Sequence, residues 1–168
     1  MRILVTAASK YGGTAGIAEA IGRTLENESL EVDVLPVDEV SDLEGYDSVV
    51  LGSGVYAGRW LRSARRFADE HADALSEKPT WLFSSGPIGD FPAGEPLDVG
   101  ELLRTTRARG HHLFGGRLVT SSLGLRERAF ARLLHVPAGD FREWAAAAAW
   151  ATAIARTLAN EQGVASQA

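Results

Sequence analysis

The chain has 168 residues, 45% of them hydrophobic and 23% charged, a composition typical of one globular domain that buries roughly 70% of its unfolded surface. It has no cysteine, which excludes disulfide scaffolds, thiolate metal sites and cysteine nucleophiles. The net charge is −5, and the first 50 residues carry 3 basic and 10 acidic side chains. Because an acidic chain repels nucleic-acid phosphates, we expect no nucleic-acid binding.

The first apolar run, residues 2–6, leads directly into a polar turn. It is too short for a signal peptide or a membrane span, so a cytoplasmic location is expected. No repeat or low-complexity linker divides the chain. We therefore expect a single domain over residues 1–160 and a flexible C-terminal tail over residues 161–168.

Short apolar runs alternate with helical patterns along the whole chain. Strands are expected at residues 2–6, 31–35, 48–51, 80–83 and 113–118. Helices are expected after Thr14, which is a candidate cap, from residue 60, from an Asp98 cap to about residue 108, and over residues 141–158 behind a capping box of Asp140 and Glu143. This alternation predicts an α/β fold with a parallel sheet and helices on both faces.

The connection after the first strand has the chemistry of an anion site. It consists of Ser9, Lys10, Tyr11, Gly12, Gly13 and Thr14. Hydroxyls and glycine amides at the start of a helix would wrap a terminal phosphate, which the helix dipole also favours. An ordinary turn with Thr14 as the cap explains the same residues equally well. The segment is not a P-loop, because the Gly-Lys-Ser/Thr ending is missing.

The connection after the third strand is rich in glycine and aromatic residues. Its members are Ser53, Gly54, Val55, Tyr56, Ala57, Gly58 and Trp60. Residues 52–57 match the dinucleotide pattern Gly-x-Gly-x-x-Ala, but they do not follow the first strand, as that fingerprint requires. The glycines are better suited to close approach of a flat ring, with Tyr56 and Trp60 stacking on it. The alternative for Trp60 is that it opens the apolar face of the next helix.

A third connection, after the fourth strand, would cover the opposite edge of such a ring with backbone donors and apolar side chains. It contains Ser84, Ser85, Gly86, Pro87, Ile88, Gly89 and Phe91. The alternative interpretation is a long surface loop.

Other chemistries fit the sequence poorly. The chain has no Gly-x-Ser-x-Gly elbow, and the first and third strands do not end in the acids of a receiver domain. Adjacent residues of a strand point to opposite faces, so His111 and His112 indicate no metal site. No side chain is identified as a catalytic acid or base.

Taken together, the three loops resemble those of the flavodoxin family over about residues 1–160. The resemblance implies a three-layer, doubly wound fold with a five-stranded parallel sheet of order 2-1-3-4-5, and noncovalently bound FMN. By this likeness residues 9–14 bind the FMN phosphate, residues 53–60 lie beside the dimethylbenzene and N5 side of the ring, and residues 84–91 form the loop at its pyrimidine side.

Within that family, residues 55–60, 114–118 and 139–144 are similar to the menaquinone-dependent protoporphyrinogen dehydrogenase branch. The segment 119–138 alternates apolar residues with arginines, so it either rests on the inner face of a membrane or lids the flavin, or simply packs on the sheet edge. This likeness implies a redox partner protein or a small organic substrate such as a quinone or porphyrinogen, with at most peripheral membrane contact.

Three functions remain open on the sequence alone: an FMN electron carrier, an FMN-dependent oxidoreductase of the protoporphyrinogen or quinone type, and a domain of this fold without flavin. An aromatic pocket with no cation near the ring would disfavour the negatively charged reduced flavin and so lower its reduction potential.

Overall fold

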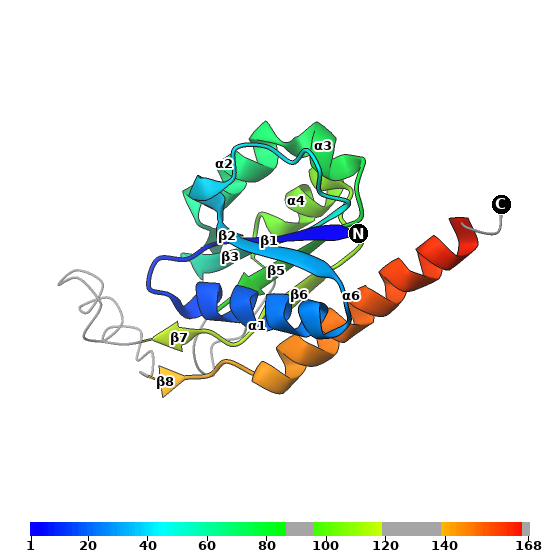
Figure 1. Ribbon diagram of the computed structural model, residues 1–168. Coiled ribbons are helices and arrows are strands. Elements are labelled where there is room, and N and C mark those ends of the chain that lie inside the picture. Colours follow the sequence, from blue (N-terminus) through cyan, green and yellow to red (C-terminus); the bar gives the residue numbers. More distant parts are fainter. Residues whose placement is uncertain (87–95, 119–138, 166–168) are drawn as a thin grey trace.

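The computed structural model describes residues 1–86, 96–118 and 139–165. Its main sheet holds five parallel strands, β1 (Arg2–Ala8), β2 (Glu31–Pro36), β3 (Ser48–Tyr56), β5 (Thr80–Ser85) and β6 (His111–Phe114), in the order β2-β1-β3-β5-β6 (Figure 1). The extra label, β4 (Arg59–Trp60), belongs to a short strand that pairs antiparallel with the end of β3. The predicted order 2-1-3-4-5 of the parallel strands is therefore confirmed.

Helices cover both faces of this sheet (Figure 1). On one face lie α1 (Gly13–Asn27) and α6 (Trp144–Ala165), and on the other lie α2 (Arg62–Glu70), α3 (Ala72–Ser76) and α4 (Val99–Thr106). A short 3₁₀ turn, η1 (Val37–Glu39), follows β2. None of the described helices is both long enough and apolar enough to cross a membrane.

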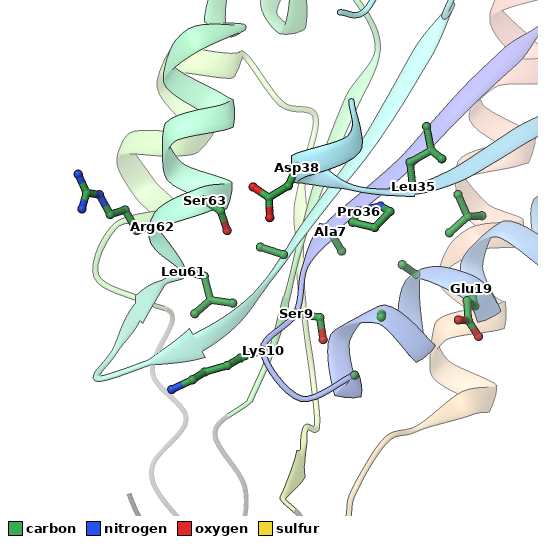
Figure 2. A pocket seen from close by; sticks show the side chains of 15 residues that line it. Ala7, Ser9, Lys10, Glu19, Leu35, Pro36, Asp38, Leu61, Arg62 and Ser63 are labelled. Atoms are coloured by element: carbon green, nitrogen blue, oxygen red, sulfur yellow. The ribbon is translucent and has the colours of Figure 1, made fainter. Parts of the chain in front are cut away.

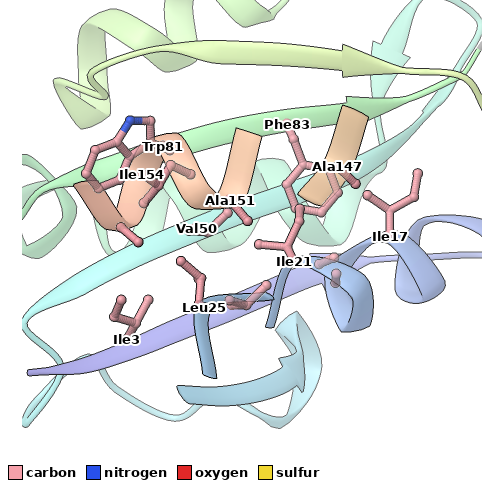
Figure 3. Close-up of a cluster of buried hydrophobic side chains, with 14 of the residues drawn as sticks. Ile3, Ile17, Ile21, Leu25, Val50, Trp81, Phe83, Ala147, Ala151 and Ile154 are labelled. Atoms are coloured by element: carbon pink, nitrogen blue, oxygen red, sulfur yellow. The ribbon is translucent and has the colours of Figure 1, made fainter. Parts of the chain in front are cut away.

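Each face has its own hydrophobic cluster. Under α1 and α6, the side chains of Ile17, Ile21 and Leu25, spaced four residues apart on one face of α1, pack against Val50 and Phe83 of the sheet (Figure 3). The other cluster includes Leu4, Leu51 and Leu82 on the opposite side of the same strands. Both faces of β1, β3 and β5 are buried, which explains why the sequences of these strands contain continuous apolar runs.

Strand β2 forms one edge of the sheet. Its outward carboxylates, Glu31 and Asp33, pair with Arg2 of the neighbouring strand at 3.6 and 2.7 Å. Val34 is 37% exposed, and Pro36 ends the strand. The edge is therefore bordered by charges and by a residue without an N–H.

The strand predicted over residues 113–118 is divided in the structure. Beyond β6, Gly115 lies so close to the backbone of Phe141 that a Cβ would be 2.1 Å from its carbonyl oxygen. The chain then forms β7 (Arg117–Leu118), which pairs antiparallel with β8 (Gly139–Asp140) in a separate ribbon. The predicted strand 113–118 therefore covers the end of β6 and the whole of β7, and the close contact of Gly115 with Phe141 lies between them.

The final helix also differs from the prediction at both ends. It begins at Trp144, and the Asp140 carboxylate accepts hydrogen bonds from Arg142 instead of capping the helix. It continues to Ala165, so the described part of the expected tail is helical. The segments 87–95 and 119–138 lie outside the described residues, and the predicted amphipathic stretch lies within the second of them.

Candidate functional site

The three predicted loops leave the sheet at its carboxyl edge. One follows β1, the second is the connection between β3 and β4, and the third follows β5. Helices α1 and α2, which follow β1 and β3, lie on opposite faces of the sheet, so the chain diverges between these two strands. Such a divergence is where open α/β sheets leave room for a ligand.

The first loop presents an uncapped helix start. Gly12 is the N-cap of α1 in the left-handed region, at φ 77°, and no side chain caps the helix. The first turn holds no acidic residue, so the amides at this end favour an anion. Thr14, predicted as the cap, lies inside the helix and is 5% exposed, which makes the cap prediction wrong.

Ser9 supplies the most specific signal in this loop. Its hydroxyl oxygen is enclosed and has no hydrogen-bond partner in the described part of the chain. A buried hydroxyl without a partner is costly, and native proteins rarely leave one unless something else binds there. Together with the uncapped helix start, this hydroxyl fits the phosphate end of the implied FMN.

The first and second loops approach each other closely at Gly54. A Cβ on Gly54 would lie 3.1 Å from Thr14 Oγ1 and 3.7 Å from the side chains of Leu61 and Tyr56. A larger residue would push the end of β3 away from α1. The glycine therefore allows the two predicted binding loops to form one continuous rim.

The second loop is a tight hairpin. Val55 pairs with Trp60 and Tyr56 with Arg59, which leaves Ala57 and Gly58 as a two-residue turn with φ of 49° and 74°. Positive φ at both central residues is the turn that matches the twist of a hairpin. The hairpin places Tyr56, which is 39% exposed, on the rim.

A lysine from the first loop reaches this tyrosine. Lys10 Nζ lies 5.2 Å from the ring centroid of Tyr11 and 5.3 Å from that of Tyr56, and the two ring centroids are 6.4 Å apart. These distances are in the range of cation–π contacts. The two loops thus share an aromatic cluster with a positive charge.

Trp60 does not take part in that cluster, which corrects the stacking role expected for it. The ring is 2% exposed and packs in the hydrophobic cluster beneath α2. Its indole N–H donates to Ser84 Oγ at 2.7 Å, and its backbone N–H donates to the Asp98 carboxylate at 3.0 Å. Trp60 thus belongs to the apolar cluster beneath α2, as the alternative expected, but it lies in strand β4 and not in the helix. Asp98 stands at the N-cap position of α4, yet its carboxylate binds the hairpin and makes no side-chain cap hydrogen bond.

Two of the predicted serine ligands also direct their hydroxyls inward. Ser53 is fully buried, and its Oγ accepts the Leu61 N–H at 2.9 Å and donates to the Gly54 carbonyl. Ser84 is fully buried between Trp60 and His111. These hydroxyls brace the rim from within, so direct contact of either with a ligand is not supported.

The third loop is described only at its start. Ser85 is 6% exposed, and Gly86, at φ 111°, donates its N–H to the Phe114 carbonyl at 3.0 Å. This amide extends the pairing toward β6, so it is not one of the backbone donors expected for a ring. Pro87, Ile88, Gly89 and Phe91 lie outside the described residues.

A pocket of about 590 Å³ opens against the outer side of the first loop, toward β2 (Figure 2). Ser9, Lys10 and Gly12 contribute to its wall. Much of the remaining lining is apolar, from Ala7, Ala8, Leu35, Pro36 and Leu61. Asp38 of η1 and Ser63 of α2 also line the pocket. The volume suits a small organic ligand.

Sequence reasoning missed the β3–β4 hairpin and the anchoring role of Asp98. The sequence indicates this hairpin only weakly, because its turn, Ala57-Gly58, has one glycine and no Asn or Asp, the residues typical of such turns. The contact of Asp98 with Trp60 spans 38 residues, and no local pattern reports it.

The fold and the rim define an α/β protein with a doubly wound sheet, in which an uncapped helix start and a hairpin with an exposed tyrosine lie at the switch in strand order. A family model described as "Flavodoxin domain" matches residues 4–143. The chain therefore belongs to the flavodoxin domain family.

Curated relatives are similar over part of the chain. The protein called protoporphyrinogen IX dehydrogenase [quinone] of Escherichia coli (strain K12) is 27% identical over 94 residues, which are 55% of this chain and 52% of that protein. An uncharacterized protein of Methanocaldococcus jannaschii is 29% identical over 99 residues, 58% of this chain and 62% of that protein. The chain thus matches between half and two thirds of the length of these relatives.

Solved structures share the fold. A flavodoxin from the domain Archaea superposes with a TM-score of 0.58 and 21% identity, over 80% of this chain and 99% of its own. Rubredoxin oxygen:oxidoreductase from Desulfovibrio gigas has a TM-score of 0.68 and 12% identity, over 96% of this chain and 37% of its own. At these identities the likeness concerns the fold.

Proposed function

We propose that this chain binds FMN noncovalently and acts as an electron-transfer protein. The observation that carries the proposal is the enclosed Ser9 hydroxyl, which has no partner among the described residues and lies beside the uncapped start of α1. A dianionic phosphate there would accept hydrogen bonds from that hydroxyl and from the helix amides, and charge-assisted bonds of this kind are stronger than neutral ones. The flavodoxin family membership supports the same cofactor.

Bound FMN would supply the redox centre, while the chain holds and shields it. Tyr56, exposed on the hairpin, is the side chain of the described rim best placed to stack on the ring. Lys10 brings a positive charge next to Tyr56. This charge favours the negatively charged reduced ring, and so works against the low reduction potential expected from the sequence.

Ser9→Ala tests the phosphate loop. We expect FMN affinity to fall about tenfold, as the loss of one hydrogen bond to a charged group implies. The affinity for riboflavin, which has no phosphate, should not change. The stability of the flavin-free protein should stay equal or rise, because the variant removes a buried hydroxyl without a partner. Titrations followed by flavin fluorescence measure both affinities.

Ser41→Ala is the matched control, since this exposed serine contacts Asp42 outside the rim and its variant should bind both flavins like the wild type. Equal FMN affinity in the Ser9→Ala variant would remove the phosphate loop from the proposal. The visible spectrum of the purified protein, followed by phosphorus stoichiometry of the released compound, tests the cofactor itself. Protein that stays colourless after incubation with FMN would be a flavodoxin-fold domain without flavin.

The second candidate function is an FMN-dependent oxidoreductase with its own quinone or porphyrinogen substrate. The similarity to the Escherichia coli dehydrogenase favours it. A carrier should be reduced by a reductase at a rate that depends strongly on salt and should turn over no small molecule, because charged surfaces steer protein encounters. An oxidoreductase should oxidise protoporphyrinogen or reduce a quinone directly.

A further inference from the structure

Hydrogen bonds join Trp60 directly to Ser84 and Asp98, and through Ser84 to His111. Ser84 of β5 accepts its indole N–H at 2.7 Å, and Asp98, at the start of α4, accepts its backbone N–H at 3.0 Å. His111, the first residue of β6, has Nε2 2.8 Å from Ser84 Oγ. Trp60 is 2% exposed and Ser84 is fully buried, so these bonds form away from water, where the loss of a partner is costly.

Both bonds involve the same hydroxyl group. Ser84 accepts the indole N–H, and its Oγ also lies within hydrogen-bonding distance of His111 Nε2, as donor or acceptor according to the tautomer of the ring. A continuous path of hydrogen bonds thus runs from His111 through Ser84 to Trp60.

The path ends on the element that shapes the rim. Trp60 is the last residue of β4 and pairs with Val55, so a fixed indole fixes the short arm of the hairpin. The next residue, Leu61, is held by Ser53 at 2.9 Å. The hairpin carries Tyr56 at its exposed end.

We propose that His111 is a positioning residue for the rim: acting through Ser84, it holds Trp60 and thereby the hairpin that presents Tyr56. The inference rests on the proposed FMN site and names a residue outside the three loops. Ser84 is the first residue predicted for the third connection and lies in β5, so the same path joins the described start of that connection to the hairpin.

A spectroscopic test follows the path in flavin-free protein. The indole N–H resonance of Trp60, assigned with Trp60→Phe, should move in His111→Phe because Ser84 loses its histidine partner. It should return close to its wild-type position in His111→Gln, whose side-chain amide offers a polar group in place of Nε2. His112→Gln is the matched control, because His112 stacks on Phe114 at 4.3 Å between centroids and on Trp150 at 5.7 Å, on the other side of the sheet.

The functional readout is flavin affinity. His111→Phe should bind FMN and riboflavin five- to tenfold more weakly, because the ring side of the site is altered, whereas Ser9→Ala weakens FMN alone. His111→Gln and His112→Gln should bind both flavins like the wild type. Wild-type affinity in His111→Phe, or an equal loss in His112→Gln, overturns this inference. A wild-type chain that binds no flavin overturns the proposed function instead, and with it the role of His111.

Discussion

Gly52 shows how little space remains at the centre of β3. A Cβ at this position would lie 2.1 to 2.5 Å from three ring atoms of Phe83, which is itself fully buried. We expect Gly52→Ala to destabilise the protein by about 1–3 kcal/mol, the usual cost of overpacking a filled core. Urea unfolding followed by circular dichroism measures the change.

Gly100→Ala is the control for that substitution. Gly100 lies in α4, and a Cβ there has no neighbour within 4 Å in the described structure. Alanine should be neutral or stabilise the helix by up to about 1 kcal/mol. A Gly52→Ala variant as stable as Gly100→Ala would show that Phe83 can move aside.

Thr14 and Trp60 have roles other than those predicted, and Asp98 stands at the predicted N-cap position of α4 without making a side-chain cap hydrogen bond. The sequence identifies what Thr14, Trp60 and Asp98 can donate, accept or bury, but the tertiary structure decides which partner each one meets. Thr14 lies in the first turn of α1, and the carboxylate of Asp98 accepts the backbone N–H of Trp60, 38 residues away in the sequence. Ser9 could be selected as a candidate because its loop is local in sequence, and its role as a ligand stays a prediction. That its hydroxyl has no partner among the described residues became visible only in the structure.

At the scale of elements, the β7–β8 ribbon braces the start of α1. A Cβ on Gly13 would lie 3.4 Å from Arg117 Cβ, and one on Gly16 would lie 2.5 Å from a guanidinium nitrogen of Arg142. Arg142 is in turn held by Asp140, with Nε 2.7 Å from Oδ1, and it stacks on the ring of Trp144. The start of α1, which follows the first loop, therefore rests on this ribbon and on Arg142 beyond it.

Acid should weaken the ribbon. Hydrogen bonds from Arg142 lower the pKa of Asp140 to about 2. The ionised, paired carboxylate therefore stabilises the folded state above its ordinary pKa of 3.8, and this contribution is lost as the pH falls toward 2. Asp140 is 43% exposed, so solvent screening limits the effect to below about 1 kcal/mol. Asp140→Asn should be slightly less stable than the wild type at pH 5 and equally stable near pH 2, by urea unfolding at each pH.

An Arg142→Gln background supplies the control for the acid experiment. Without the guanidinium, Asp140→Asn should no longer change stability in a pH-dependent way. The same pH dependence in both backgrounds would assign it to other groups.

Helices and long strands were predicted well because periodicity and alternation are local signals. The short strands were not, since β4, β7 and β8 have two residues each and no periodicity to detect. They exist because tertiary contacts hold them: Asp98 at β4 and the backbone of Phe141 beside Gly115. These same short strands shape the candidate site, so the site was predicted less completely than the sheet.

At the scale of the whole molecule, the hydrophobic cluster under α6 holds the last helix and α1 against the sheet. Ile154 is 2% exposed and belongs to the cluster that joins α6 and α1 to the sheet (Figure 3). We expect Ile154→Ala to cost about 2–5 kcal/mol and Ile154→Val about 0.5–1.5 kcal/mol, because each deleted carbon group leaves a cavity. Denaturant unfolding of both variants tests this.

A graded loss across this pair would show that the cluster is rigidly packed. Equal losses from the two variants would show that α6 settles into the vacated space and would contradict the expectation.

The strand order itself was predictable from the sequence, because alternating strands and helices, right-handed crossovers and the family resemblance all indicated the same arrangement.

The charged and proline-terminated border of β2 has a consequence for how copies of this chain meet. An unpaired strand offers a template on which another polypeptide can extend the sheet. A strand added beside β2 would lie next to the carboxylates of Glu31 and Asp33, and Pro36 would offer it no backbone N–H. Lateral fusion of sheets into fibrils is therefore discouraged along this side of the molecule.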